Sequence, residues 1–149
     1  MTKILIVCVG NICRSPIAAA FLQRDLPGHQ TSSAGIAALV GHDIDQSARE
    51  AADVYQLRLP PHQARQFTVE LGVANDLILV MEAGHKRRIE RIAPQLSGRT
   101  FLFSHWTGGR DIVDPYHRSK DVHNMVLAQL KDAAAAWSER LSRQVQVSK

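Results

Sequence analysis

Cysteine is scarce in this chain, whose 149 residues include only Cys8 and Cys13, five positions apart. Two such residues do not make the disulfide framework of a small secreted domain. No apolar run approaches the ~20 residues that a membrane-spanning helix needs, and the N-terminus has no basic region followed by a long apolar stretch and a cleavage site. We therefore expect a cytoplasmic protein that does not insert into membranes.

Charge of one sign and aromatic residues are also limited, at a net charge of +4 and 5% aromatic content. The basic residues are scattered and form no aromatic-rich stripe, which argues against a nucleic-acid partner. The seven histidines are dispersed without metal-ligand spacing, so we expect no metal and no cofactor. The sequence pattern places four of them at the surface: His29, His42, His85 and His123.

The chain shows no linker and no internal repeat, and its hydrophobic content of 45% suffices for one sizeable core. We expect a single domain spanning residues 1–149. Strand-like apolar runs alternate with helical patterns, as in βαβ units. The expected strands are Ile4–Val9, a segment around Gln30–Ser33, Leu77–Met81 and Thr100–Phe103. The expected helices are Pro16–Asp25, Gln46–Gln56, Gly84–Ile92 and Asp121–Leu141.

This order of elements predicts an α/β fold with a doubly wound, four-stranded parallel sheet of flavodoxin-like or Rossmann-like type and helices on both faces. The last expected helix has apolar residues at three- and four-residue spacing, so one face, including Trp137, should pack on the sheet. In such a fold the loop after the first strand is the natural ligand site.

That loop carries the most informative segment, Cys8-Val9-Gly10-Asn11-Ile12-Cys13-Arg14-Ser15-Pro16. Its spacing lets successive backbone N–H groups surround a tetrahedral oxyanion above the positive end of the following helix. The same field would stabilise Cys8 as a thiolate, while Arg14 holds two anion oxygens and Ser15 hydrogen-bonds the sulfur. The expected phosphate-binding residues are Val9, Gly10, Asn11, Ile12, Cys13, Arg14 and Ser15. A cysteine after a strand is otherwise often a small core residue, but Gly10 and Asn11 favour the functional reading.

The Cys-x5-Arg-Ser pattern near the N-terminus resembles that of the low-molecular-weight protein tyrosine phosphatases. Three further stretches match this family in their expected order: Ser32-Ser33-Ala34-Gly35, His62-Gln63-Ala64-Arg65-Gln66 and Asp114-Pro115-Tyr116. The resemblance therefore covers essentially the whole chain. Two more segments, Leu77-Ile78-Leu79-Val80-Met81-Glu82 and His105-Trp106, are most similar to the bacterial branch that serves exopolysaccharide and capsule synthesis.

The resemblance implies phosphotyrosine hydrolysis through a phosphocysteine, with Cys8, Arg14 and Asp114 as catalytic residues. A phenolic leaving group needs a proton donor, and Asp114 is the candidate. Asp114-Pro115 could instead simply start a turn, and Asp111 is a local competitor without the Pro-Tyr context. The family also implies a support network that holds the loop in shape. Its expected members are Asn11, Ser15, Ser33 and His62, although Ser33 could be a strand-end hydroxyl and His62 a surface residue.

The family positions for the substrate pocket are Ile12, Leu39 and Tyr116, which would grip an aromatic ring. Leu39 could instead belong to the core, and animal members carry a bulky aromatic residue near it. Cys13 matches a neighbouring cysteine of the family and is expected to form a disulfide with oxidised Cys8. It could also be a small buried residue behind the loop.

The implied partner is a phosphotyrosine protein, above all a bacterial tyrosine autokinase of polysaccharide export, acted on by a monomer or weak oligomer. A protein-arginine phosphatase of the same family is the runner-up, but that branch places threonine where Ile12 stands. A catalytically silent phosphotyrosine-binding module would be expected to lose the nucleophile or the acid. A thioredoxin-coupled arsenate reductase needs further cysteines, and none follows Cys13.

Overall fold

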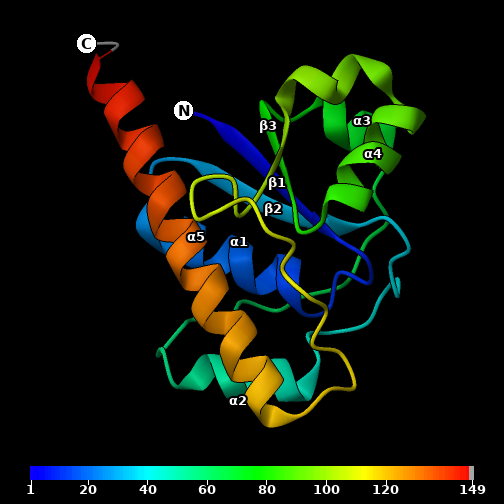
Figure 1. The fold of residues 1–149 in the computed structure, drawn as a ribbon, viewed down its shortest axis with the longest axis vertical. Helices are drawn as coiled ribbons and strands as arrows, with labels where there is room; N and C mark the ends of the chain where they lie inside the picture. The colour runs from blue at the N-terminus through cyan, green and yellow to red at the C-terminus, as the bar shows by residue number, and fades with distance from the viewer. Residues whose placement is uncertain (148–149) are drawn as a thin grey trace.

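The computed structural model describes residues 1–147 and shows a parallel sheet with helices on both faces (Figure 1). Its four strands lie in the order β2-β1-β3-β4. Their bounds are β1 (Lys3–Cys8), β2 (Gln30–Gly35), β3 (Leu77–Val80) and β4 (Thr100–Leu102). The predicted α/β fold with a doubly wound, four-stranded parallel sheet is confirmed. The last two residues of the expected domain 1–149 lie outside the described residues.

Helices cover the two faces of the sheet unequally. One side carries α1 (Arg14–Asp25), α2 (Gln46–Asp53) and the long α5 (Lys120–Val147). The other side carries α3 (Val69–Val73), α4 (Ala83–Ile92) and the 3₁₀ helix η1 (Pro94–Arg99). No helix among the described residues combines the length and apolar character needed to cross a lipid bilayer.

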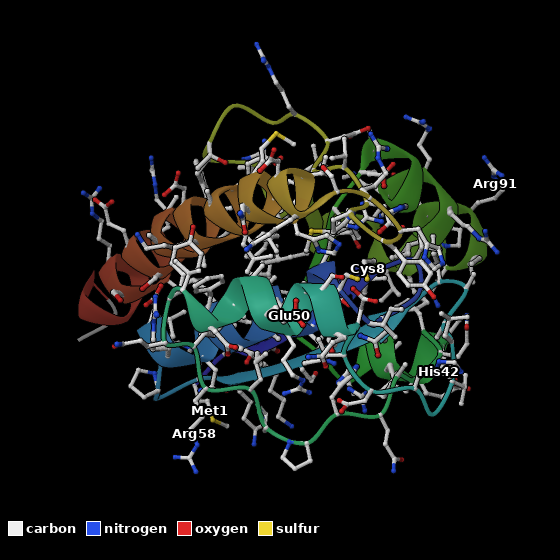
Figure 2. The ribbon with its side chains drawn as sticks, turned by 90° about the horizontal axis from the view of Figure 1, so that it is seen from below. Met1, Cys8, His42, Glu50, Arg58 and Arg91 are labelled. Atoms are coloured by element: carbon white, nitrogen blue, oxygen red, sulfur yellow. The ribbon has the colours of Figure 1, made fainter. Side chains whose placement is uncertain are left out.

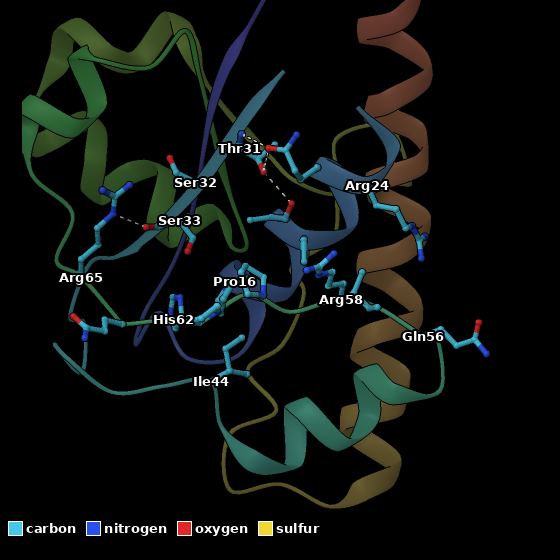
Figure 3. Close-up of a pocket in the computed structure, with 17 residues that line it drawn as sticks. Pro16, Arg24, Thr31, Ser32, Ser33, Ile44, Gln56, Arg58, His62 and Arg65 are labelled. Carbon is cyan, nitrogen blue, oxygen red and sulfur yellow. Dashed lines mark hydrogen bonds between the residues drawn. The ribbon is translucent and has the colours of Figure 1, made fainter. Parts of the chain in front are cut away.

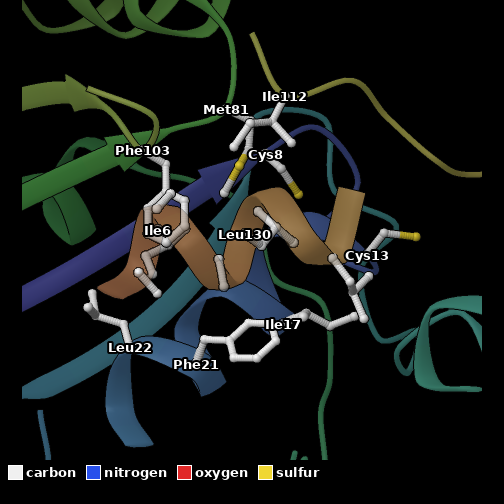
Figure 4. Close-up of a cluster of buried hydrophobic side chains, with 14 of the residues drawn as sticks. Ile6, Cys8, Cys13, Ile17, Phe21, Leu22, Met81, Phe103, Ile112 and Leu130 are labelled. Atoms are coloured by element: carbon white, nitrogen blue, oxygen red, sulfur yellow. The ribbon is translucent and has the colours of Figure 1, made fainter. Parts of the chain in front are cut away.

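The central strand β1 is buried on both faces and divides the core in two. Ile4 and Ile6 point into the cluster built with α1 and α5, part of which is shown in Figure 4. Leu5 and Val7 point into the second cluster, with α4 and η1. This alternation explains why β1 reads as a continuous apolar run, as expected for a strand covered on both sides.

Burial corrects part of the sequence interpretation. Trp137 is 5% exposed and donates its indole N–H to the Phe103 carbonyl oxygen at 2.8 Å, so its predicted place in the core is confirmed. The surface assignment of His85 and His123 was wrong, since both are buried. Each lies on the inward face of its helix, and His85 shares that face with Ile89 at i+4.

The element boundaries differ from the expected ones at several ends. The second strand extends to Gly35, and the helix expected at Gln46–Gln56 ends at Asp53. The short elements α3 and η1 were not predicted, because five or six residues are too few to show a helical period. None of these differences changes the sheet order, which places the carboxyl ends of β1 and β3 side by side.

Candidate active site

The site forms where β1 ends and α1 begins. Cys8 is the last residue of β1, and α1 starts at Arg14 with Cys13 in the N-cap position. The Cys13 side chain makes no capping hydrogen bond, so the first backbone N–H groups of α1 remain available for an anion. In Figure 2 Cys8 lies within the molecule, whereas Arg58 and Arg91 lie at the outer rim of the view.

A cavity of about 200 Å³ opens over this loop. Its walls come from the loop, from the segment after β2 and from the segment before α5. They comprise Cys8, Val9, Gly10, Ile12, Cys13, Arg14, Ala37, Leu39, Asp114 and Tyr116. The expected nucleophile, arginine, acid and pocket residues thus meet in one place. Of the expected phosphate-binding residues, Asn11 and Ser15 are not in the cavity wall, and both are fully buried.

Asn11 is the hub behind the loop. Its backbone adopts a left-handed conformation, with φ of 60°, as its residue type allows. Its amide nitrogen donates to Ser15 Oγ at 2.8 Å and to Ser33 Oγ at 2.9 Å. Its side-chain oxygen accepts the Arg65 backbone N–H at 2.9 Å, and its carbonyl oxygen lies 2.6 Å from His62 Nε2. The expected support residues therefore all contact Asn11, and Arg65 joins them.

The Cys8 sulfur lies 2.9 Å from Ser15 Oγ, and Cys8 is only 2% exposed. Ser15 Oγ accepts a hydrogen bond from Asn11, and its single hydrogen has two acceptors within reach, the Cys8 sulfur at 2.9 Å and the Ala34 carbonyl oxygen at 3.4 Å, of which the sulfur is the nearer. A hydroxyl that donates to sulfur stabilises the thiolate more than the thiol. This geometry suits a cysteine that alternates between attacking and leaving.

Arg14 is 1% exposed and is held from two further elements. Its Nη1 donates to Glu82 Oε2 at 2.5 Å and to the Ile112 carbonyl oxygen at 2.7 Å. Its Nη2 lies 3.8 Å from Asp114 Oδ2. Sequence reasoning did not find Glu82 or Ile112 as partners. Glu82 did carry a signal, because it lies two residues after the end of β3, at the sheet edge where ligand sites form.

Asp111 and Asp114, the two candidate acids, differ in their contacts. Asp111 Oδ1 accepts the Ala83 backbone N–H at 2.9 Å, at the start of α4, and Asp111 is not part of the cavity wall. Asp114 lines the cavity, and its Oδ1 accepts the Tyr116 backbone N–H at 3.0 Å. The side chain of Asp114 is 46% exposed, so it can exchange protons with substrate and water. The position of Asp111 is better explained by its hydrogen bond to the N-terminus of α4.

The pocket walls are apolar and aromatic. Ile12 is buried within the loop, Leu39 is 37% exposed at the rim, and Tyr116 is half-buried beside Asp114. The exposure of Leu39 and its place in the cavity wall argue against a core role. Ala37, which sequence reasoning missed, adds a small residue to the wall. A flat ring can lie between such side chains while its phosphate reaches the loop.

Comparison with known proteins identifies the family. The family model described as low molecular weight phosphotyrosine protein phosphatase matches residues 3–147. The chain belongs to this family. A relative from Klebsiella pneumoniae is 49% identical over 140 residues, which cover 94% of this chain and 97% of that protein.

Solved structures of related phosphatases share the whole fold. The tyrosine phosphatase Wzb from Escherichia coli K30, in complex with sulphate, superposes with a TM-score of 0.92 at 44% identity, covering 95% of this chain and 99% of that chain. Wzb from Vibrio vulnificus, in complex with benzylphosphonate, gives a TM-score of 0.91 at 43% identity, covering 93% and 98%. This phosphatase is therefore an enzyme of the protein-tyrosine-phosphatase class.

Cys13 of the phosphatase is 4% exposed. Burial raises the pKa of its thiol far above the usual range, and the negative charges of Asp45 and Asp114 raise it further. The Cys13 thiol therefore stays protonated in the closed site. Figure 4 shows Cys13 at the edge of the core cluster, with its sulfur pointing away from Ile17 and Leu130.

A larger cavity, of about 780 Å³, lies behind the loop (Figure 3). It shares Ser33, His62 and Arg65 with the Asn11 network but includes none of the three residues Cys8, Arg14 and Asp114. Of these two cavities, the smaller one brings Cys8, Arg14 and Asp114 together. Within residues 1–147, no three His, Cys, Asp or Glu side chains are grouped so as to hold a metal ion.

Gly35 permits the close approach of β2 to the loop. A Cβ atom at this position would lie 2.3 Å from the Val9 carbonyl oxygen and 3.1 Å from the Asn11 Cβ. We predict that Gly35→Ala shifts the loop and lowers kcat/KM for para-nitrophenyl phosphate at least about 10-fold. Gly98→Ala is the control, since no atom lies within 4 Å of its Cβ position, and it should stay near wild type. Equal activities of the two variants would show that loop placement does not depend on Gly35.

Proposed function

We propose that the protein hydrolyses phosphotyrosine in proteins through a phosphocysteine on Cys8, without a metal ion. The observation that carries this proposal is that Cys8, Arg14 and Asp114 line one cavity of about 200 Å³, whose other lining residues are mostly apolar. A thiolate, a buried guanidinium and an exposed carboxyl group are the nucleophile, the anion holder and the acid that such a reaction needs.

In the first step the Cys8 sulfur attacks phosphorus in line with the tyrosine oxygen. The S–P bond forms, the P–O bond to tyrosine breaks, and Asp114 donates its proton to the departing phenolic oxygen. Arg14 and the loop N–H groups hold the three equatorial oxygens, where negative charge gathers. The loop of Val9, Gly10, Asn11, Ile12, Cys13, Arg14 and Ser15 supplies these contacts in our proposal.

In the second step the Asp114 carboxylate takes a proton from a water molecule, whose oxygen attacks phosphorus from the side that tyrosine has left. The S–P bond breaks, inorganic phosphate departs, and Cys8 returns as a thiolate. Ser15 stabilises that thiolate through the 2.9 Å contact with the sulfur. Asn11, Ser33 and His62 serve in both steps by keeping the loop in its anion-binding shape.

We infer that the physiological substrate is a tyrosine autokinase of polysaccharide export, acted on in the cytoplasm. This rests on the similarity of the chain to the bacterial branch of the family and on its likeness to the Wzb phosphatases. A single chain supplies every residue of the cavity, so a monomer or weak oligomer suffices. A Cys8→Ser variant that retains a phosphotyrosine kinase from cell extract, released by vanadate, would support the partner, whereas retention of no tyrosine-phosphorylated protein would contradict it.

The role of Asp114 as the proton donor can be tested with aryl phosphates whose leaving groups differ in acidity. Asp114→Asn should slow hydrolysis of phenyl phosphate about 10²-fold or more, and aryl phosphates with very acidic leaving groups far less, since the latter need no proton. Asp111→Asn is the matched control and should not show this dependence. Equal losses across the leaving-group series would point to another acid.

Cys8→Ser should abolish turnover in the same assays while leaving the fold and phosphate binding intact, because Arg14 and the loop N–H groups remain. Phosphate binding by the inactive variant can be followed through its melting temperature. Substantial residual turnover by Cys8→Ser would contradict the phosphocysteine mechanism.

The contribution of Ile12 to substrate choice can be tested by comparing phosphotyrosine and phosphoarginine peptides. The same comparison distinguishes the proposed function from the runner-up, a protein-arginine phosphatase. Wild type should prefer phosphotyrosine peptides over matched phosphoserine, phosphothreonine and phosphoarginine peptides, because only the flat ring uses the apolar walls. Ile12→Thr should lower kcat/KM for phosphotyrosine and raise it for phosphoarginine. If the wild-type enzyme instead prefers phosphoarginine peptides, the proposed function is wrong and the protein is a protein-arginine phosphatase.

Cys13 is tested by oxidation. Peroxide converts the Cys8 thiolate to a sulfenic acid, and the Cys13 thiol then closes a disulfide with loss of water. Cys8 and Cys13 both line the cavity over the loop, so the two sulfurs belong to one site. Cys13→Ser should start near wild-type activity but recover less after peroxide followed by dithiothreitol. Unchanged recovery would make Cys13 a packing residue only.

A further inference from the structure

Resting on the proposed function, we propose that His85 is a positioning residue that holds Glu82 against Arg14 and so orients the phosphate-binding guanidinium. His85 is not among the residues that line the cavity. It acts through Glu82, which follows β3 and precedes the first turn of α4.

The contact is specific in its atoms. Nε2 of His85 lies 3.4 Å from Glu82 Oε2, the same oxygen that accepts the hydrogen bond from Arg14 Nη1 at 2.5 Å. Glu82 and His85 are three residues apart at the start of α4, which places both side chains on one face. The Glu82 side chain is 32% exposed, so without a second contact it could rotate into solvent.

The other ring nitrogen shows that His85 is not explained by packing. His85 Nδ1 is buried and has no hydrogen-bond partner. Leaving a buried polar atom unpaired destabilises a fold, and an apolar side chain at this position would remove that penalty. The imidazole is therefore accounted for by its Nε2 side, which faces Glu82.

The charge state of the ring agrees with this role. Burial lowers the pKa of His85; the Glu82 carboxylate opposes this shift, and Arg14 adds to it. A neutral ring that carries its hydrogen on Nε2 presents that hydrogen to Glu82 Oε2, 3.4 Å away, and leaves Nδ1 as a bare acceptor.

Loss of this contact should misplace Arg14. With Glu82 turned to solvent, Nη1 keeps only the Ile112 carbonyl oxygen, and the guanidinium is free to turn toward Asp114, whose Oδ2 lies 3.8 Å from Nη2. An Arg14–Asp114 pair would occupy both the anion holder and the acid. The chemical step should suffer, because Arg14 acts on charge that develops in the transition state.

Single substitutions distinguish positioning from packing. His85→Leu should lower kcat/KM for para-nitrophenyl phosphate about 10-fold while leaving the melting temperature unchanged or higher. His85→Gln keeps an N–H donor and should recover part of the loss. His123→Leu is the matched control, since His123 is buried with both ring nitrogens unpaired and contacts no site residue by hydrogen bond. It should retain kcat/KM within about twofold.

A double-mutant cycle provides the decisive readout. If His85 acts through Glu82, Glu82→Gln should also lower kcat/KM, and adding His85→Leu to it should cost little more. Additive losses, or a His85→Leu variant with wild-type kcat/KM, would overturn the proposal. Failure here leaves wild-type turnover and its dependence on Cys8 unchanged, so it is distinguishable from failure of the proposed function.

Discussion

The active site depends on the hydrogen bonds of one buried residue, Asn11. It adopts a left-handed backbone and uses its side-chain nitrogen, side-chain oxygen and carbonyl oxygen in four contacts. These contacts connect the loop to α1, to β2 and to the segment around residues 62–65. Since these contacts are all to protein atoms, the loop shape does not depend on a bound substrate, which limits reorganisation during the reaction.

The second constraint on the site is the burial of the Arg14 guanidinium. A guanidinium that is 1% exposed must be paired, because an isolated buried charge is strongly destabilising. The protein pairs it with Glu82 and a carbonyl oxygen on Nη1 and leaves Nη2 near Asp114. These contacts fix the orientation of the guanidinium, and Arg14 forms part of the cavity wall.

The sequence predicted the parts of the molecule that are local. The apolar run before Cys8, the Cys-x5-Arg spacing and the left-handed tendency of Asn11 are all encoded within a few residues. The doubly wound, four-stranded parallel sheet followed from the alternation of strands and helices. The resemblance to the family supplied Ser33, His62 and Asp114, whose places in the site no local pattern could have given.

The rest depends on tertiary contacts between distant elements. Glu82 and Ile112 reach Arg14 from 68 and 98 residues away, and Arg65 reaches Asn11 from 54. No periodicity or spacing encodes such pairs. The prediction failed for His85 and His123 for a different reason. Both lie at helical spacing from buried residues, but histidine is a polar residue type and was assigned to the surface.

The central claim is that phosphate passes through Cys8 without a metal ion. The most direct measurement is mass spectrometry of the enzyme quenched in acid during turnover of a phosphotyrosine peptide, in a buffer containing a metal chelator. A phosphocysteine intermediate predicts a phosphoryl group on the peptide that contains Cys8, accumulating and then decaying as substrate is exhausted. A phosphoryl group on another residue, or turnover that requires added metal and leaves Cys8 unmodified, would contradict it.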